Sequence, residues 1–92
     1  MSASSLKLAH YVPPEFPMEA RQRALSGWVD VQFAVRTDGA VGEVTIVGAQ
    51  PVGVFEQAAV DAVRKWRYKP VMRDGQPVSQ RARVRLSFAF QP

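Results

Sequence analysis

The stretch RKWRYKP, residues 64–70, places two large aromatic side chains among four basic ones. Basic groups attract phosphates and exposed rings stack on unpaired bases, so single-stranded nucleic-acid-binding surfaces use this combination. The end of a packed helix is the other interpretation, and helix geometry separates the two. Trp66 falls eleven residues after Phe55 on one helical stripe, whereas Arg64 and Lys65 fall off that stripe. We therefore expect Trp66 to point into the core, which favours packing over a nucleic-acid surface.

Residue types that carry enzyme chemistry are scarce. The chain has one histidine, His10, and no cysteine, so a metal site or a thiol nucleophile has too few candidate groups. Asp38 and Asp74 each precede a glycine, which is typical of turns, and the serines lie outside any G-x-S-x-G motif. The glycines form no phosphate-binding loop. The sequence therefore predicts a protein that is not an enzyme and that needs no metal and no cofactor.

Length and composition predict one small domain. Of the 92 residues 47% are apolar, and no apolar run is long enough to cross a membrane. The first eight residues, MSASSLKL, lack the apolar stretch of a signal peptide. Twelve Lys and Arg against eight Asp and Glu give a net charge of +4, which narrows the class of partner only weakly.

The N-terminal quarter predicts an extended arm followed by a short helix. We take residues 1–12 as the arm and residues 13–92 as the folded domain. Three prolines between residues 13 and 17 prevent a regular helix in the segment that joins them. Pro17 is suited to a first helical position, and Gly27 suits a position just past a helix end. We expect a helix of about ten residues between them.

The remainder predicts two alternating strands, a helix and a final strand. Val29, Val31, Phe33 and Val35 alternate with polar residues up to the Asp38-Gly39 turn, and a bulge is expected near Gly42 in the return strand. An apolar stripe then runs from Phe55 to Trp66. The predicted fold is α+β: a two-layer sandwich in which two helices pack on one face of an antiparallel sheet.

The final strand carries arginines on one face. Arg81, Arg83 and Arg85 alternate with inward-facing apolar residues, and Tyr68 is expected to cover the core edge with its hydroxyl in water. The arginine row has three interpretations: a phosphate-binding stripe, charges that prevent self-pairing of an exposed edge, or a strand that accepts a partner peptide.

Several of these segments together resemble the C-terminal domain of the TonB energy-transducer family. The resemblance runs from about Pro13 to Phe90 and rests on the order and spacing of its motifs. These are Phe16-Pro17 with Ala20-Arg21, the alternating strand that starts at Gly27, Asp38-Gly39 with Val41, Pro51 before Phe55-Glu56, and Trp66-Arg67-Tyr68-Lys69-Pro70. Glu15 stands where some members have a glutamine that contacts the transporter peptide.

The resemblance implies a periplasmic binding module. It would bind the TonB box of outer-membrane TonB-dependent transporters as an added strand, and so transmit inner-membrane proton-motive energy for uptake of siderophores or similar nutrients. The implied contacts come from the arm and from the final strand: Glu15, Phe16, Pro17, Arg81, Arg83, Val84, Arg85, Leu86, Ser87 and Phe88.

The resemblance also implies partners outside this chain. In the family, an inner-membrane helix and a proline-rich spacer connect the domain to an ExbB/ExbD-type motor, and we interpret the chain as the C-terminal part of such a protein. A homodimer through the receptive strand edge is a further expectation. Two alternatives stay open: a protein-interaction module of another envelope protein, and a small basic nucleic-acid-binding domain.

Overall fold

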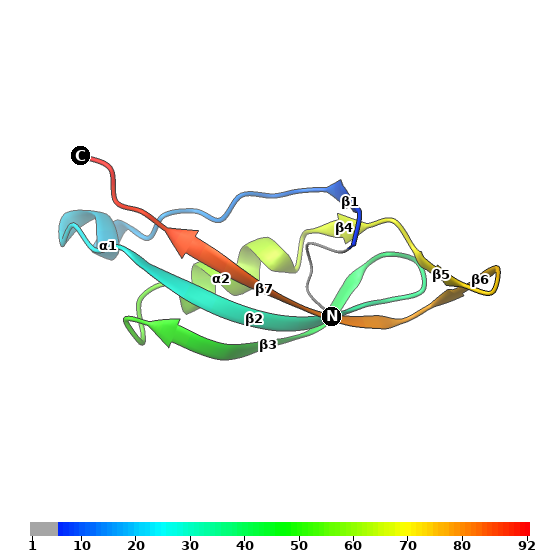
Figure 1. The fold of residues 1–92 in the computed structure, drawn as a ribbon. Helices are drawn as coiled ribbons and strands as arrows, with labels where there is room; N and C mark the ends of the chain where they lie inside the picture. Colours follow the sequence, from blue (N-terminus) through cyan, green and yellow to red (C-terminus); the bar gives the residue numbers. More distant parts are fainter. Residues whose placement is uncertain (1–5) are drawn as a thin grey trace.

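A computed structural model describes residues 6–92, so the first five residues of the predicted arm lie outside the described part (Figure 1). A three-stranded antiparallel sheet of order β3-β2-β7 forms the centre, and two-stranded pairs β1-β4 and β5-β6 flank it. The elements are β1 (Leu8–His10), α1 (Met18–Gln22), β2 (Gly27–Val35), β3 (Val41–Gln50), α2 (Glu56–Val63), β4 (Arg67–Tyr68), β5 (Val71–Arg73), β6 (Gln76–Val78) and β7 (Gln80–Phe88). Among residues 6–92, no helix is long and apolar enough to cross a membrane.

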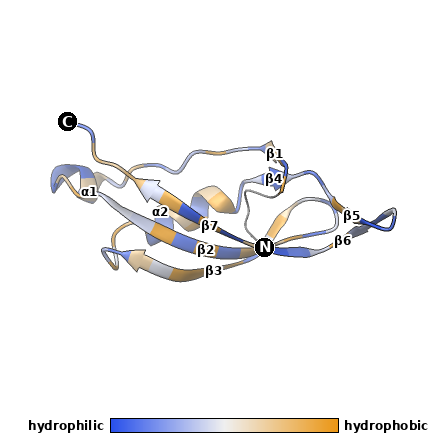
Figure 2. Cartoon of the chain, in the orientation of Figure 1, coloured by the Kyte–Doolittle hydropathy of each residue, from blue (hydrophilic) through white to orange (hydrophobic). Residues whose placement is uncertain are grey.

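The predicted two-layer α+β architecture is confirmed. Helix α2 lies against β2 and β3, while α1 lies beyond the end of the sheet where β2 begins (Figure 1). The expected apolar stripe is buried at Phe55, Ala59, Ala62, Val63 and Trp66 and half-buried at Ala58, although the helix itself ends at Val63 and Trp66 follows it. In Figure 2, hydrophilic residues gather at the tip of the β5-β6 hairpin, which projects away from this core.

The two sides of β2 pair differently. Nine consecutive residue pairs join β2 to β7 without interruption, from Gly27 opposite Phe88 to Val35 opposite Gln80. The pairing with β3 shifts register twice, and the second shift coincides with Glu43, whose φ of 52° is unusual for a residue with a side chain. The bulge expected near Gly42 is therefore confirmed. As a consequence, β7 is a regular edge strand and β3 a distorted one.

Helix α1 is half the predicted length. It has five residues, Pro17 occupies the capping position before its first turn, and Gly27 opens β2 instead of following the helix directly. The helix ends in a Schellman motif, whose left-handed position is occupied by Ala24 with φ 52°. Two backbone hydrogen bonds define the motif: Leu25 N donates to Ala20 O at 2.9 Å, and Ala24 N donates to Arg21 O at 3.3 Å.

Candidate functional site

The open edge of β7 is the first feature of the candidate site. One side of β7 is paired with β2, and no strand within residues 6–92 pairs with its other side. In an antiparallel pair, alternate residues direct both backbone groups toward the same neighbour, so roughly four residues of β7 present an unpaired N–H and C=O. Such a row accepts an extended peptide as an added strand.

A groove of 360 Å³ lies beside this edge. Its β7 wall is made of Val84, Arg85, Leu86 and Ser87, four of the residues predicted from the resemblance. In the structure the extended path of the arm continues to Pro17, so the arm is residues 6–17 from here on; it is drawn in blue in Figure 1 and runs along the other side of this surface. The groove residues that the sequence reasoning missed are Leu8, Tyr11 and Pro14 of the arm, and Trp66 and Tyr68. The alternating aromatic residues of segment 64–70 are the sequence signal for Trp66 and Tyr68. That pattern indicates packing against the core, and by itself it does not indicate that the same rings line a groove.

Trp66 and Tyr68 hold the arm against the core. Trp66 is 3% exposed, as predicted, and its indole Nε1–H donates to the Val12 carbonyl oxygen at 2.7 Å. Its ring centroid lies 5.4 Å from that of Tyr11. Tyr68 is also 3% exposed, stacks on Phe33 at 5.8 Å, and has a pKa raised to about 12 by burial. Tyr68 therefore covers the core edge with an almost fully buried ring.

The burial of Trp66 gives a spectroscopic prediction. In a Trp28→Phe variant, the only remaining tryptophan is Trp66, so its emission should be blue-shifted and weakly quenched by acrylamide. Adding single-stranded DNA or RNA should leave the spectrum unchanged, because a stacking platform needs exposed rings. Strong quenching, together with a salt-sensitive response to nucleic acid, would instead support the nucleic-acid interpretation.

The arginine row is largely neutralised across the sheet. Arg85 makes two hydrogen bonds to the Asp30 carboxylate, at 2.7 and 3.0 Å, and its guanidinium lies 3.9 Å from the ring centre of Trp28. The hydrogen bond from Arg85 lowers the pKa of Asp30 below its ordinary value. Arg81 forms an ion pair with Glu43 at 3.3 Å. These pairs make the row a poor phosphate-binding stripe.

Arg83 differs from its two neighbours. Its guanidinium hydrogen-bonds to the neutral side chain of Gln32 at 3.5 Å, the limit of a hydrogen bond, and its charge also helps at longer range to lower the pKa of Asp30. Within residues 6–92, no carboxylate oxygen lies at ion-pair distance from it. Arg83 is thus an exposed cation that is available to a further partner.

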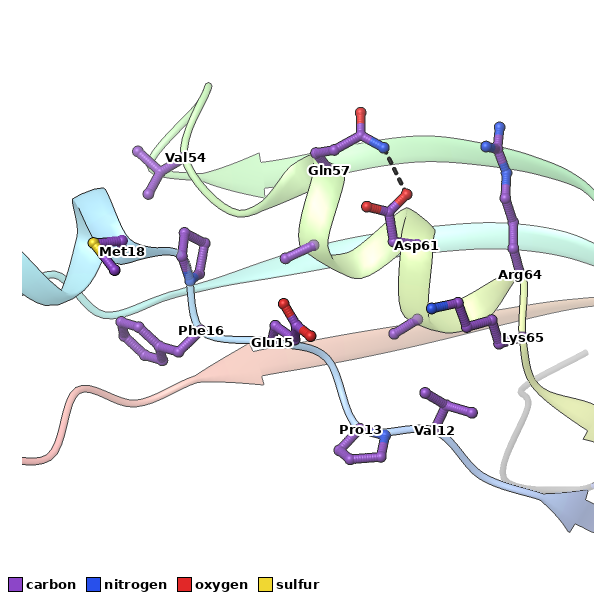
Figure 3. A pocket seen from close by; sticks show the side chains of 13 residues that line it. Val12, Pro13, Glu15, Phe16, Met18, Val54, Gln57, Asp61, Arg64 and Lys65 are labelled. Carbon is purple, nitrogen blue, oxygen red and sulfur yellow. Dashed lines mark hydrogen bonds between the residues drawn. The ribbon is translucent and has the colours of Figure 1, made fainter.

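The three predicted arm residues lie in two places. The Phe16 ring contacts those of Phe88 and Phe90, at 6.3 and 6.4 Å between centroids, so it reaches the C-terminal end of β7. Glu15 and Pro17, with Phe16, line a second groove of 750 Å³ between the arm and α2, shown in Figure 3. The structure therefore brings Phe16 to β7 and places Glu15 and Pro17 along the groove on the helix side.

The side chains of the two grooves do not form a metal site. In the part of the chain that the structure describes, no three His, Cys, Asp or Glu residues come together as a candidate metal site. The site is built from backbone edge groups, aromatic rings and one available guanidinium. This combination suits the binding of an extended peptide.

Comparison with known proteins identifies the family. Residues 12–90 match the family described as "Gram-negative bacterial TonB protein C-terminal". The chain belongs to this family. It is 40% identical over 57 residues to protein TonB of Escherichia coli (strain K12), covering 62% of this chain and 24% of that protein. It is 36% identical over 76 residues to protein TonB of Klebsiella pneumoniae, covering 83% of this chain and 31% of that protein.

A solved TonB structure has the same fold. The solution structure of the Pseudomonas aeruginosa TonB C-terminal domain superposes with a TM-score of 0.81 at 27% identity, covering 97% of this chain and 90% of that one. TonB is a family of non-enzymatic energy transducers whose C-terminal domains are periplasmic, and it works with TonB-dependent receptors and with ExbB/ExbD. The chain spans about a quarter to a third of the TonB proteins named above.

Proposed function

We propose that this chain is the C-terminal domain of a TonB-type energy transducer that binds the TonB box of outer-membrane TonB-dependent transporters by strand addition. The carrying observation is the regular, open edge of β7 beside a groove walled by the arm. In this proposal, the domain passes inner-membrane proton-motive energy to transporters of siderophores or similar nutrients. An ExbB/ExbD-type motor acts through the region that precedes the domain in the full-length protein.

The regularity of β7 favours it over β3 as the receiving edge. An added strand gains most when successive backbone groups are evenly aligned, and β7 keeps this alignment through nine pairs with β2. The outer strand β3 is interrupted by two register shifts, and natural sheets use such bulges to discourage edge pairing. Both outer strands of the sheet offer unpaired backbone groups, but only those of β7 are evenly aligned, so a peptide is expected to add to β7.

Backbone pairing at β7 gives a useful affinity. A five-residue peptide makes about five hydrogen bonds, each worth roughly 0.5–1.5 kcal/mol net, and ordering the disordered peptide offsets part of this sum. Even the upper limit of this sum, about 7.5 kcal/mol, is below the roughly 8.2 kcal/mol of a micromolar complex, so backbone pairing alone gives weaker than micromolar binding and apolar contacts in the groove must add to it. Such binding is reversible, as a protein that serves several transporters in turn requires. A second copy of the domain pairing through β7 would form a homodimer that competes with the peptide.

The experiment is an NMR titration with a synthetic TonB-box peptide from a transporter of the same organism. Shift changes should concentrate at residues 81–88 and near Phe16. Two methylated peptides then separate backbone pairing from side-chain docking: one carries N-methyl groups on one alternate set of amides, and the other on the complementary set. We expect one peptide to lose at least about tenfold in affinity and the other to retain binding, because only one set faces β7.

Two outcomes would contradict the proposal. Equal binding by both methylated peptides would show that side chains, and not paired backbone, hold the ligand. Shift changes confined to α2 and Glu15, or no binding at all, would remove β7 as the receiving strand. In that case a protein-interaction role in another envelope protein would become the better explanation of the fold.

A further inference from the structure

The alternation of β7 defines the chemistry of the strand it accepts. Val84 and Leu86 face the layer that contains Trp66, whereas Arg83 and Arg85 face the uncovered side of the sheet. Side chains of an added strand alternate in the same way, because neighbouring strands of a sheet share the pleat. One set of peptide side chains therefore points into the groove, and the other set points toward the arginines.

We propose that this domain selects a strand with a carboxylate beside Arg83 on the outer face and apolar side chains at the alternate positions. The inference rests on the proposed strand addition at β7 and adds the residue that discriminates among peptides. The carrying observation is the unequal pairing of the arginine row, in which Arg81 and Arg85 are bound to carboxylates of the chain and Arg83 is not.

Position makes Arg83 reachable from an added strand. It lies near the middle of β7 and one residue before the segment that lines the groove, so a peptide seated there passes it. Directly opposed residues on one face have Cβ atoms about 4.5–5.5 Å apart, which brings a glutamate within reach of the guanidinium. Arg85 is a weaker candidate because Asp30 and the Trp28 ring already occupy its guanidinium.

The groove supplies the matching apolar selection. Leu8 is 43% exposed and Tyr11 is 55% exposed, although both are large and belong to the wall facing β7. An apolar peptide side chain entering between this wall and Leu86 would remove these surfaces from water. The two faces together specify a strand that is apolar on one side and acidic at one position on the other.

The test uses two TonB-box peptides that differ only at the position opposite Arg83, which intermolecular NOEs identify. One carries glutamate there and the other glutamine. With the unmodified domain, the glutamate peptide should bind about two- to fivefold more tightly, and this preference should shrink as salt is added. Arg83→Gln should abolish the preference, which is measured as the ratio of the two peptides' dissociation constants with the same domain.

Arg81→Gln is the matched control, since it removes an arginine from the same row and face and should keep the preference. A preference that persists in Arg83→Gln, or that is missing from the unmodified domain although both peptides shift residues 81–88, would overturn the inference and leave strand addition intact. Failure of both peptides to bind β7 would overturn strand addition itself, and the inference with it.

Discussion

Replacing Phe55 with alanine is expected to lower the free energy of unfolding by about 3–5 kcal/mol. Phe55 is fully buried at the start of α2, and its ring stacks on Phe88 with 4.5 Å between centroids. Phe16 packs edge-on against it at 5.6 Å. The substitution removes a ring that joins the helix, the arm and the end of β7. Urea denaturation followed by circular dichroism measures the loss.

Val52→Ala is the control for Phe55→Ala, because Val52 lies in the same connection but is 80% exposed. It should change stability by less than about 0.5 kcal/mol. A loss of under 1 kcal/mol in Phe55→Ala would mean that the ring is not the anchor of this end of the core. The free energy of unfolding of a small domain is roughly 5–15 kcal/mol, so the Phe55→Ala variant is expected to be marginally stable.

The second large effect is expected from Gly39→Ala. Gly39 has φ +89°, and a Cβ placed on it would overlap the carbonyl oxygen of Tyr68. The Gly39 carbonyl also accepts the backbone N–H of Tyr68 at 2.9 Å, so the turn cannot move away without losing this bond. Adding about 1–2 kcal/mol for the left-handed backbone to about 1–3 kcal/mol for overpacking gives a loss of about 2–5 kcal/mol. Thermal or urea denaturation checks it.

The chain contains its own control for this substitution. Gly75 is the glycine of the other Asp-Gly turn and has a similar φ of +77°, but nothing lies within 4 Å of the position its Cβ would take. Gly75→Ala should therefore lower the free energy of unfolding only by the cost of a left-handed backbone at alanine, about 1–2 kcal/mol. Equal losses in the two variants would mean that the contact of Gly39 with Tyr68 does not constrain the turn.

The regular elements were predictable because each depends on a local pattern. Alternation of Val29, Val31 and Phe33 fixes which side of β2 is buried, and the buried stripe of α2 follows from helical spacing. The length of α1 was not predictable in this way. Its terminating position is Ala24, where a glycine is usual, so the sequence offered only Gly27 as a stop signal.

The candidate site was predictable in its strand and not in its walls. Alternation placed Val84, Leu86 and the arginines on opposite faces of β7, as observed. The path of the arm depends on tertiary contacts such as the bond from Trp66 to the Val12 carbonyl, which lies 54 residues away in sequence. The pairing of Arg85 with Asp30 was likewise not predictable, because it depends on which residues of β2 and β7 lie opposite each other.

The arm is attached far less extensively than the strands of the central sheet. Two residue pairs join β1 to β4, and single hydrogen bonds from Lys69 N and Trp66 Nε1 add to them, whereas nine pairs join β2 to β7. Tension applied from the N-terminal side would therefore peel the arm before it shears the sheet. Each freed residue spans at most about 3.3–3.6 Å, so released residues 6–17 would form a flexible tether of up to about 40 Å while the sheet stays intact.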